Sequence, residues 1–278
     1  MRKNAIIISM QSVLIVGASS GIGYACAKKF IVEGYEVLAL SRTECVLAGV
    51  KNYLCDVSNE SELDLTLNAL LAENPRIRHF VYSAGFSMAA PLEKADPKDY
   101  RYLYEVNFFG FVHCLRRLIP ALRHSSGSAC VVSSVGALFP IPFDPYYVSS
   151  KAALNAFCAA LQTELRPKGV RVLSVMPGGT RTDFTFKRKI YSNEKTGDYS
   201  VAVKTASEKL KEIEQQGASA NKVAEEIYNK CAASSAFYLF AAGLKNKLAC
   251  ALIRFLPQPL LTMLTRAVFL SSPGPTER

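Results

Sequence analysis

The stretch Val16-Gly17-Ala18-Ser19-Ser20-Gly21-Ile22-Gly23 decides the fold class, because it joins a short apolar run to a helical pattern over residues 21–33. Gly17 permits a tight turn, Gly21 lets a pyrophosphate approach the backbone, and Gly23 allows close packing of helix on sheet. The N–H groups at the start of the helix would then face the phosphates. The spacing is GxxxGxG. By themselves, three glycines are also compatible with a strand–helix turn that binds nothing.

Short apolar runs alternate with helical patterns along the rest of the chain. The runs typical of strands covered on both faces lie at residues 13–16, 37–40, 80–82, 129–132 and 170–175. The helical patterns lie at 21–33, 60–73, 97–123 and 147–166. This alternation predicts an α/β fold with a single Rossmann-type, doubly wound parallel sheet of about seven strands and helices on both faces.

Two later regions break this rhythm within a predicted single domain spanning residues 1–278. Residues 183–217 are polar, include a helix expected over 200–215, and are predicted to close over a substrate. Residues 236–270 are apolar with interspersed basic residues and are broken by prolines. This C-terminal extension is a lid, a surface packed on the core or on another subunit, or a peripheral membrane anchor.

Composition narrows the function classes. Half of the 278 residues are apolar and a fifth are charged, which suits a globular domain. The net charge is +10, but the basic residues are spread along the chain and the densest cluster is Lys187-Arg188-Lys189, so we expect no nucleic-acid partner. The eight cysteines form no CxxC pair and the three histidines are far apart, so we expect reduced cytoplasmic thiols and no metal.

The amino terminus mimics the start of a signal peptide, because Arg2 and Lys3 precede apolar residues. Cleavage after Ala18 would destroy the glycine stretch, so we interpret the apolar run before it as a buried first strand. No run of 18 or more apolar residues is present, so no transmembrane helix is predicted.

The second apolar run ends in Ser41-Arg42, at the position where an NAD-binding fold usually has an acidic residue for the ribose hydroxyls. Arg42 would instead pair with a 2′-phosphate through a charge-assisted fork, which favours NADP(H) over NAD(H). The alternative is a surface arginine without a ligand. Asp56, followed by Val57, is placed to meet an adenine amino group or to cap the next helix.

Tyr147 and Lys151 are four residues apart, so on a helix they share one face. A tyrosine with its usual pKa of about 10 is a poor base at neutral pH, and an adjacent ammonium would stabilise the phenolate and lower that pKa. Ser133 and Ser134 follow the apolar run 129–132, Ser134 thirteen residues before Tyr147. Tyr146 is a second tyrosine, but only Tyr147 has the four-residue spacing to the lysine.

With these motifs the chain resembles the short-chain dehydrogenase/reductase family over residues 12–182. The motifs follow the family's order: the glycine stretch, Asp56, Ser83-Ala84-Gly85, Asn107, Ser134, Tyr147 with Lys151, and Pro177-Gly178 with Thr180 and Thr182. The resemblance implies a ketone or aldehyde interconverted with an alcohol by a nicotinamide cofactor. The later regions resemble the branch of 17β-hydroxysteroid dehydrogenases and lipid-ketone reductases.

The resemblance also implies a role for each matched residue. Tyr147 would be the acid/base, Ser134 would hydrogen-bond the substrate oxygen, Lys151 would also hold the nicotinamide ribose, and Asn107 would support a water-linked proton path. The implied cofactor-binding residues are Gly17, Ser19, Ser20, Gly21, Ile22, Gly23, Ser41, Arg42, Asp56, Val57, Ser83, Ala84, Gly85, Asn107, Tyr147, Lys151, Pro177, Gly178, Thr180 and Thr182.

Two departures from the family pattern concern the central strand. Val16 replaces a threonine, and Tyr82-Ser83 replaces two asparagines, so we expect weakened hydrogen bonding there without loss of activity. Apolar residues between the serine and the tyrosine are expected either to line a substrate pocket or to pack in the core: Leu138, Phe139, Ile141 and Phe143.

Function and partners remain open at two points. The favoured function is NADP(H)-dependent oxidoreduction of a hydrophobic carbonyl or alcohol, such as a steroid, retinoid or lipid ketone. The alternative is a non-catalytic NADP(H)-binding sensor or scaffold. The resemblance implies a homodimer or homotetramer through helices 97–123 and 147–166. A cytoplasmic location is expected, with peripheral membrane contact as the alternative role of the C-terminal extension.

Overall fold

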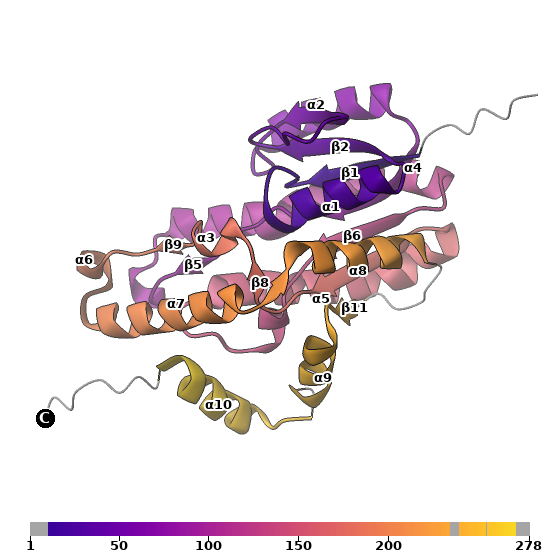
Figure 1. The fold of residues 1–278 in the computed structure, drawn as a ribbon. Coiled ribbons are helices and arrows are strands. Elements are labelled where there is room, and N and C mark those ends of the chain that lie inside the picture. Colours follow the sequence, from indigo (N-terminus) through magenta and orange to yellow (C-terminus); the bar gives the residue numbers. More distant parts are fainter. Residues whose placement is uncertain (1–10, 234–238, 254, 271–278) are drawn as a thin grey trace, which may run out of the picture.

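Residues 11–233, 239–253 and 255–270 are described by a computed structural model. Seven strands form one sheet in the order β11-β7-β6-β4-β1-β2-β3, and every neighbouring pair is parallel (Figure 1). In chain order the strands are β1 (Ser12–Val16), β2 (Glu36–Ser41), β3 (Val50–Leu54), β4 (Ile77–Tyr82), β6 (Ser128–Val132), β7 (Arg171–Met176) and β11 (Leu239–Ala241). The predicted doubly wound parallel sheet in a single domain is confirmed.

Helices cover both faces of this sheet, which explains why its central strands are mostly apolar on both sides. In β1, Leu14 and Val16 belong to one buried cluster and Val13 and Ile15 to another, because successive side chains point to opposite faces. The first cluster is covered by α2 (Glu60–Glu73), α4 (Gly110–His124) and α5 (Pro145–Leu165), and the second by α1 (Gly21–Val32) and α8 (Ala220–Ala232).

Two predicted elements differ from the structure. The helix expected over 97–123 is α3 (Pro97–Tyr104) and α4, joined by a π-helical segment over Glu105–Phe109. The predicted start of the extension, residue 236, lies too early in the chain, because the range 236–270 includes β11, which pairs with β7 at the edge of the main sheet. Leu239, Phe240 and Ala241 form too short an apolar run to be distinguished by periodicity from a helical pattern.

The polar segment 183–217 is attached to the core at both ends. Near its start β9 (Lys189–Ile190) pairs with β5 (Met88–Ala89), and after it β10 (Ala218–Ser219) pairs with β8 (Thr180–Arg181). Between them lie α6 (Asn193–Thr196) and α7 (Ser200–Gln215), which confirms the helix expected over 200–215. Short 3₁₀ turns occupy Leu92–Lys94, Val135–Leu138, Arg166–Lys168, Asp183–Thr185 and Gly197–Tyr199.

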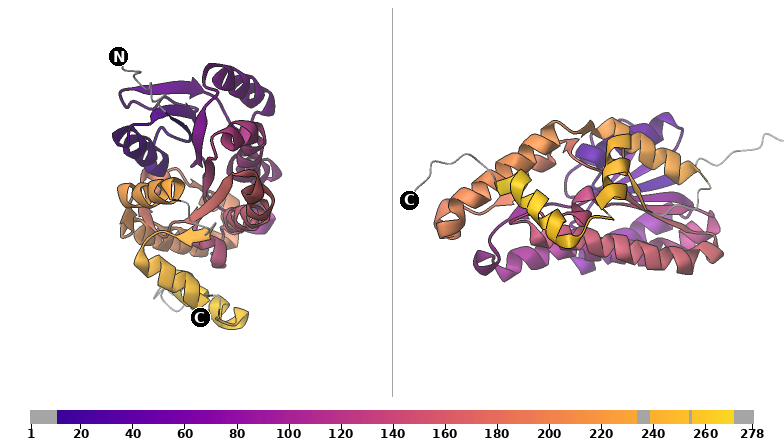
Figure 2. Two further views of the ribbon diagram at one scale, coloured as in Figure 1. Left: turned by 90° about the vertical axis from the view of Figure 1, so that its right-hand side faces the viewer. Right: turned by 90° about the horizontal axis from the view of Figure 1, so that it is seen from below.

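The chain ends in two helices, α9 (Leu244–Ile253) and α10 (Gln258–Leu270). Seen from below in Figure 2, both lie in front of the rest of the molecule. α9 packs near Val135 and Met176 through Cys250, and α10 packs along α7. Among the described residues, no helix is long and apolar enough to cross a membrane. The charged residues at the start of the chain, Arg2 and Lys3, lie outside the described residues.

Candidate active site

The glycine stretch forms the turn between β1 and α1. Gly17 and Gly21 have φ angles of +82° and +58°, which side chains other than glycine rarely adopt. A Cβ on Gly23 would lie 2.1 Å from the carbonyl oxygen of Gly17, so the helix packs as closely on the turn as the sequence predicts. Ser20 precedes α1 without a side-chain capping bond, and the first turn of α1 has no acidic residue. The N–H groups at this helix start therefore suit a phosphate.

The end of β2 has polar groups suited to the adenosine half of a cofactor. The Ser41 hydroxyl is buried and has no hydrogen-bond partner among the described residues, and polar groups are seldom buried in this way without a ligand or water to satisfy them. Arg42 is exposed and forms no ion pair within the described ranges. Its Nη1 donates to the hydroxyl of Tyr102 at 3.1 Å. These groups fit a phosphorylated ribose.

Tyr102 also connects Arg42 to Asp56, because its hydroxyl donates to Asp56 Oδ2 at 3.2 Å. Burial acts to raise the pKa of the Asp56 carboxyl, but hydrogen bonds from Ser58 and Tyr102 and the charge of Arg42 outweigh it and hold the pKa below its usual value. The alternative that Asp56 caps the next helix is wrong, since Asn59 accepts from Glu62 N there. Tyr102 was not predicted from the sequence, because it lies on α3, far along the chain from Arg42 and Asp56.

Ser134, Tyr147 and Lys151 lie together, from the end of β6 and the first turns of α5. The Ser134 hydroxyl accepts from Gly136 N at 2.9 Å and lies close enough to the Tyr147 hydroxyl to lower the pKa of the phenol. Lys151 is buried, and its Nζ lies 5.7 Å from the centroid of the Tyr147 ring and donates to Val132 O at 2.9 Å. The arrangement brings a proton donor, a second hydroxyl and an amine to one place.

The protonation of this pair differs from the expected phenolate. Burial raises the pKa of Tyr147, and the nearby Ser134 hydroxyl offsets only part of that rise. Burial also lowers the pKa of Lys151 to about 8. Lys151 is not among the groups that shift the Tyr147 pKa in this arrangement, in which desolvation has the largest effect. Tyr147 is a neutral hydroxyl at neutral pH, ready to donate a proton.

Asn107 lies in the π-helical segment, whose wider turn directs its side chain toward the end of β4. Its amide accepts from Phe86 N and donates to Phe86 O, each at 3.0 Å, and donates to Ser150 Oγ at 3.1 Å. Both hydrogens of the amide are thus used within the protein. The side chain positions the neighbouring loop, and the water-linked proton path stays a prediction.

Gly85, in the loop after β4, lies close to Lys151 and Asn107, where there is little room for a side chain. A Cβ on Gly85 would lie 3.3 Å from Lys151 Nζ and 3.1 Å from Asn107 Oδ1. Earlier in the same loop, Ser83 N donates to Val16 O at 2.8 Å, and Ala84 N would be 2.7 Å from a Cβ on Gly17. The loop therefore seals the site between the glycine turn and the lysine.

The expectation of weakened hydrogen bonding around the central strand is wrong for Tyr82. Its buried hydroxyl donates to Val106 O, in the π-helical segment, at 2.5 Å. Gly110 leaves room for this contact, since a Cβ there would lie 2.5 Å from the hydroxyl oxygen and 3.2 Å from Val57, itself a buried residue. Tyr82 thus anchors the segment that holds Asn107.

The neighbours Ser133 and Tyr146 are engaged elsewhere. The Ser133 hydroxyl donates to Lys151 O at 3.0 Å, inside the protein. The Tyr146 ring stacks on Tyr100 with centroids 4.8 Å apart. These contacts agree with the choice of Ser134 and Tyr147 over their neighbours.

The loop after β7 lies against the glycine turn. Thr182 lies opposite Gly21, its side-chain atoms 3.5 to 3.9 Å from a Cβ built there. Thr180 Oγ1 donates to Gly178 O at 3.0 Å, and Pro177 O accepts from Val135 N at 2.9 Å, so the loop is fixed beside the Ser134 turn. The structure therefore brings both ends of the predicted cofactor site together.

Three further residues here were not found from the sequence. Lys187 Nζ donates to Ser20 Oγ at 3.1 Å, which places an ammonium at the glycine turn. The Phe184 ring lies 5.8 Å from that of Tyr147. The Asn246 side chain of α9 packs against Gly178, since a Cβ built on this glycine would lie 2.4 to 2.8 Å from the amide atoms of Asn246. All three come from the polar segment or the C-terminal extension, whose folding onto the core the local sequence does not indicate.

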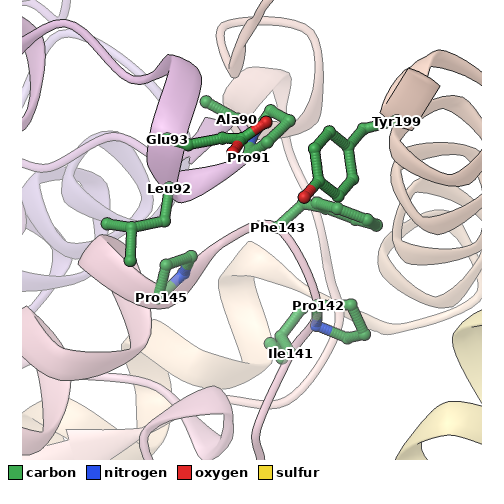
Figure 3. Close-up of a pocket in the computed structure, with 9 residues that line it drawn as sticks. All are labelled: Ala90, Pro91, Leu92, Glu93, Ile141, Pro142, Phe143, Pro145 and Tyr199. Atoms are coloured by element: carbon green, nitrogen blue, oxygen red, sulfur yellow. The ribbon is translucent and has the colours of Figure 1, made fainter. Parts of the chain in front are cut away.

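A cavity of about 730 Å³ opens beside the start of α5. Figure 3 shows Phe143 and Tyr199 side by side on its wall, with Ile141 and Pro142 beneath and Pro145 and Leu92 across from them. Ile141 and Phe143 were expected in a substrate pocket. Leu138 and Phe139 pack instead against the cluster of Val135 and Met176 beneath α9, so for them the alternative of core packing holds.

One group outside this site has metal-ligand chemistry among the described residues: Glu60, Asp64 and His113. Both ring nitrogens of His113 already face carboxylates, at 3.4 Å from Glu60 and 3.0 Å from Asp64. Arg117 lies 3.5 Å from Asp64 and supplies a competing positive charge. The group is explained as a surface ion-pair cluster and carries no metal assignment.

Comparison with known proteins agrees with the site. Residues 11–192 match the short chain dehydrogenase family. The Helicobacter pylori protein named Probable short-chain type dehydrogenase/reductase VdlC is 28% identical over 92% of this chain and 97% of its own. A 3-ketodihydrosphingosine reductase of Bacteroides thetaiotaomicron is 30% identical over 74% of this chain and 77% of its own. A solved short-chain dehydrogenase from Streptomyces avermitilis has a TM-score of 0.76 at 24% identity, covering 94% of this chain and 97% of that one.

The fold and the site define a nicotinamide-binding oxidoreductase built on a Rossmann-type sheet. The chain belongs to the short-chain dehydrogenase/reductase family.

Proposed function

We propose that this protein is an NADP(H)-dependent reductase of hydrophobic ketones or aldehydes, which also oxidises the corresponding alcohols. The observation that carries the proposal is the juxtaposition of Ser134, Tyr147 and the buried Lys151 beside an apolar cavity that the start of α5 lines. Both hydroxyls can approach one carbonyl oxygen, which is the geometry that carbonyl protonation needs.

The residues would divide the reaction as follows. The bound nicotinamide supplies or accepts the hydride. Ser134 would donate a hydrogen bond to the substrate oxygen, and neutral Tyr147 would transfer its proton to that oxygen as negative charge develops. Lys151 would hold the ribose and, when protonated, stabilise the phenolate that remains. Because the tyrosine starts as the acid, the proposal favours carbonyl reduction.

Arg42 supports NADP(H) over NAD(H). No acidic residue ends β2, the Arg42 guanidinium forms no ion pair among the described residues, and the Ser41 hydroxyl beside it is unsatisfied there. Arg42→Ala should raise the Kd of NADPH about tenfold or more while leaving that of NADH unchanged, since one charge-assisted pair contributes about 1.5–3 kcal/mol. Fluorescence titration measures both constants. An equal rise for both cofactors would contradict the assignment.

Catalysis is distinguished from a sensor or scaffold role by a substrate screen with two matched variants. NADPH oxidation is followed with a panel of hydrophobic ketones. Tyr147→Phe should lower kcat at least a hundredfold without changing the Kd of NADPH, because general acid catalysis contributes about 10²–10⁴-fold. Tyr146→Phe, which removes the neighbouring hydroxyl, should keep its activity. NADPH binding without oxidation across the panel would favour the sensor.

The substrate class is proposed from the cavity wall, which carries only one charged side chain, Glu93. Relatives include the 3-ketodihydrosphingosine reductase and an NADPH-dependent 1-acyldihydroxyacetone phosphate reductase of Schizosaccharomyces pombe. We therefore place lipid ketones first in the screen, before the steroids and retinoids that the sequence also suggests. A serine 3-dehydrogenase among the relatives makes small polar alcohols the necessary comparison.

A homodimer or homotetramer through α3–α4 and α5 is part of the proposal. Phe109, at the junction of the π-helical segment and α4, is 49% exposed and would be covered by such an interface. Light scattering after size exclusion measures the mass. Phe109→Glu should shift it to the monomer, and an unchanged mass would place the interface elsewhere.

A further inference from the structure

The two C-terminal helices α9 and α10 expose more large apolar side chains than packing on the core explains. Leu252 is 67% exposed, Met263 60% and Phe255, between the helices, 87%. We call the following set of residues the arm face: Leu248, Leu252, Phe255, Leu260, Met263, Leu264 and Val268. Such a concentration of exposed apolar side chains marks a surface that another phase or molecule covers.

Helical spacing separates this face from the face that packs. In α10 the buried residues are Leu261, Thr265 and Phe269, at four-residue intervals. The exposed Leu260 and Leu264 have the same spacing on the side next to them, and Met263 lies opposite Leu261, so most of the circumference of α10 is apolar. A helix of this kind is not stable against water on its outer side. Figure 2 shows α9 and α10 together on the outside of the molecule.

Charge identifies what covers the arm face. Residues 243–276 include Lys245, Lys247, Arg254 and Arg266 and no Asp or Glu. Arg266 is exposed on α10, and Lys247 keeps half of its side chain exposed although it lies 3.3 Å from Glu226. An apolar face with only basic residues in its segment is complementary to an anionic lipid surface.

A second copy of the chain fits this face less well. A twofold interface brings the same patch of both subunits together, so the basic residues of the segment would face each other without an acidic partner from that segment. The helices are also too short and insufficiently apolar to span a bilayer, so a helix lying in the interface is the remaining membrane geometry.

We propose that the arm face binds the surface of an anionic lipid bilayer, with α9 and α10 lying at the boundary of headgroups and acyl chains. α10 packs along α7, and Tyr199, the residue before α7, lines the cavity. The membrane-bound arm would therefore lie next to the wall of the apolar cavity. The inference stands on the arm itself and holds whichever carbonyl compound is the substrate.

The test is flotation of the full chain with phosphatidylcholine vesicles, with and without phosphatidylglycerol. The protein should float with the anionic vesicles and be released by high salt. Leu264→Glu should reduce the bound fraction about tenfold or more, because it places a charge at the centre of the face. The matched control is Leu65→Glu on α2, where the leucine is 72% exposed and far along the chain from the arm; this variant should float like the wild type.

Two further measurements complete the design. NADPH titration of both variants confirms that they are folded, and light scattering measures their mass. A wild type that stays away from anionic vesicles overturns the proposal, as does an equal loss for Leu65→Glu. If Leu264→Glu dissociates an oligomer while the wild type fails to float, a second copy covers the face and the lipid inference is wrong.

Discussion

Tyr82→Phe removes a single buried hydroxyl that connects the central strand to the π-helical segment. Tyr82 is 1% exposed, and its hydroxyl donates to the buried carbonyl of Val106 at 2.5 Å. Without it the carbonyl loses its donor inside the core, which costs about 1–3 kcal/mol; removing the buried hydroxyl as well returns part of this. We expect a loss of about 1–2 kcal/mol in the free energy of unfolding, and a fall in Tm of about 2–6 °C.

Gly110 allows a sharper form of the same prediction. A Cβ added by Gly110→Ala would lie 2.5 Å from the Tyr82 hydroxyl oxygen, whereas its next contacts are at 3.2 Å. Alone, this substitution should cost about 1–3 kcal/mol through overpacking. In the Tyr82→Phe background the closest obstacle is gone, so the double variant should be more stable than the sum of the two changes predicts, by about 1–2 kcal/mol.

Urea unfolding of the four proteins in this double-mutant cycle measures the coupling, and Tyr199→Phe serves as the control. Tyr199 is 39% exposed, so loss of its hydroxyl should change stability by less than about 0.5 kcal/mol. If the two substitutions add within about 0.3 kcal/mol, the hydroxyl does not occupy the space beside Gly110 and the reasoning is refuted.

Three further predictions concern the cofactor site, the start of α5 and the glycine turn. Lys187→Ala should raise the Kd of NADPH and of NADH by the same factor, about three- to tenfold, because its ammonium lies at the glycine turn, where the phosphates common to both cofactors would bind. Lys204→Ala, at an exposed lysine on α7, should change neither Kd. Fluorescence titration measures both constants, and a rise confined to NADPH would contradict the assignment. Burial raises the pKa of Asp144 to about 7, so the folded protein binds this proton more tightly than the unfolded chain and stability falls as pH rises from about 4 to about 7. In Asp144→Asn the free energy of unfolding, measured with urea, should fall less steeply with pH, by up to about 1.4 kcal/mol per pH unit. An unchanged dependence on pH would contradict the assignment. Gly23→Ala should abolish cofactor binding, because its Cβ meets a carbonyl oxygen at 2.1 Å, whereas Gly34→Ala, with a φ of +82° and nothing within 4 Å, should cost only about 1–2 kcal/mol and keep binding in the same titration.

Most of the sheet could be predicted from the sequence because its strands are covered on both faces. Burial on both sides makes the runs in β1, β2, β4 and β6 continuously apolar and the run in β7 mostly so, and a run of this kind is visible without knowledge of its partners. β11 has only three residues and gains its identity from pairing with β7, so nothing local distinguishes it.

The site separates into local and non-local parts in the same way. Tyr147 and Lys151 are one helical turn apart, and the glycine stretch is a single turn, so each could be assigned from spacing. The contact of Tyr102 with Arg42 joins residues 60 positions apart, and that of Lys187 with Ser20 joins residues 167 apart. The pKa of Tyr147 was predicted in the wrong direction because burial, which the sequence does not give, has the largest effect on it.

The basic triplet Lys187-Arg188-Lys189 shows what a count of charges leaves out. Lys187 donates to Ser20 at the glycine turn, and Lys189 lies 2.5 Å from a carboxylate oxygen of Asp99 on α3. The Arg188 side chain is only 2% exposed and lies 2.5 Å from Glu214 of α7.

Arg188 is also connected to the start of α5. Its Nε donates to Ser87 Oγ at 3.0 Å, and Ser87 donates to Asp144, the residue before α5, at 2.6 Å. Three consecutive cations thus attach the polar segment to three different parts of the fold, so they form no continuous basic patch for a polyanion. Phe184 of the same segment contacts Tyr147, so the segment is coupled to Tyr147 by two routes, through the Tyr147 ring and through the start of its helix.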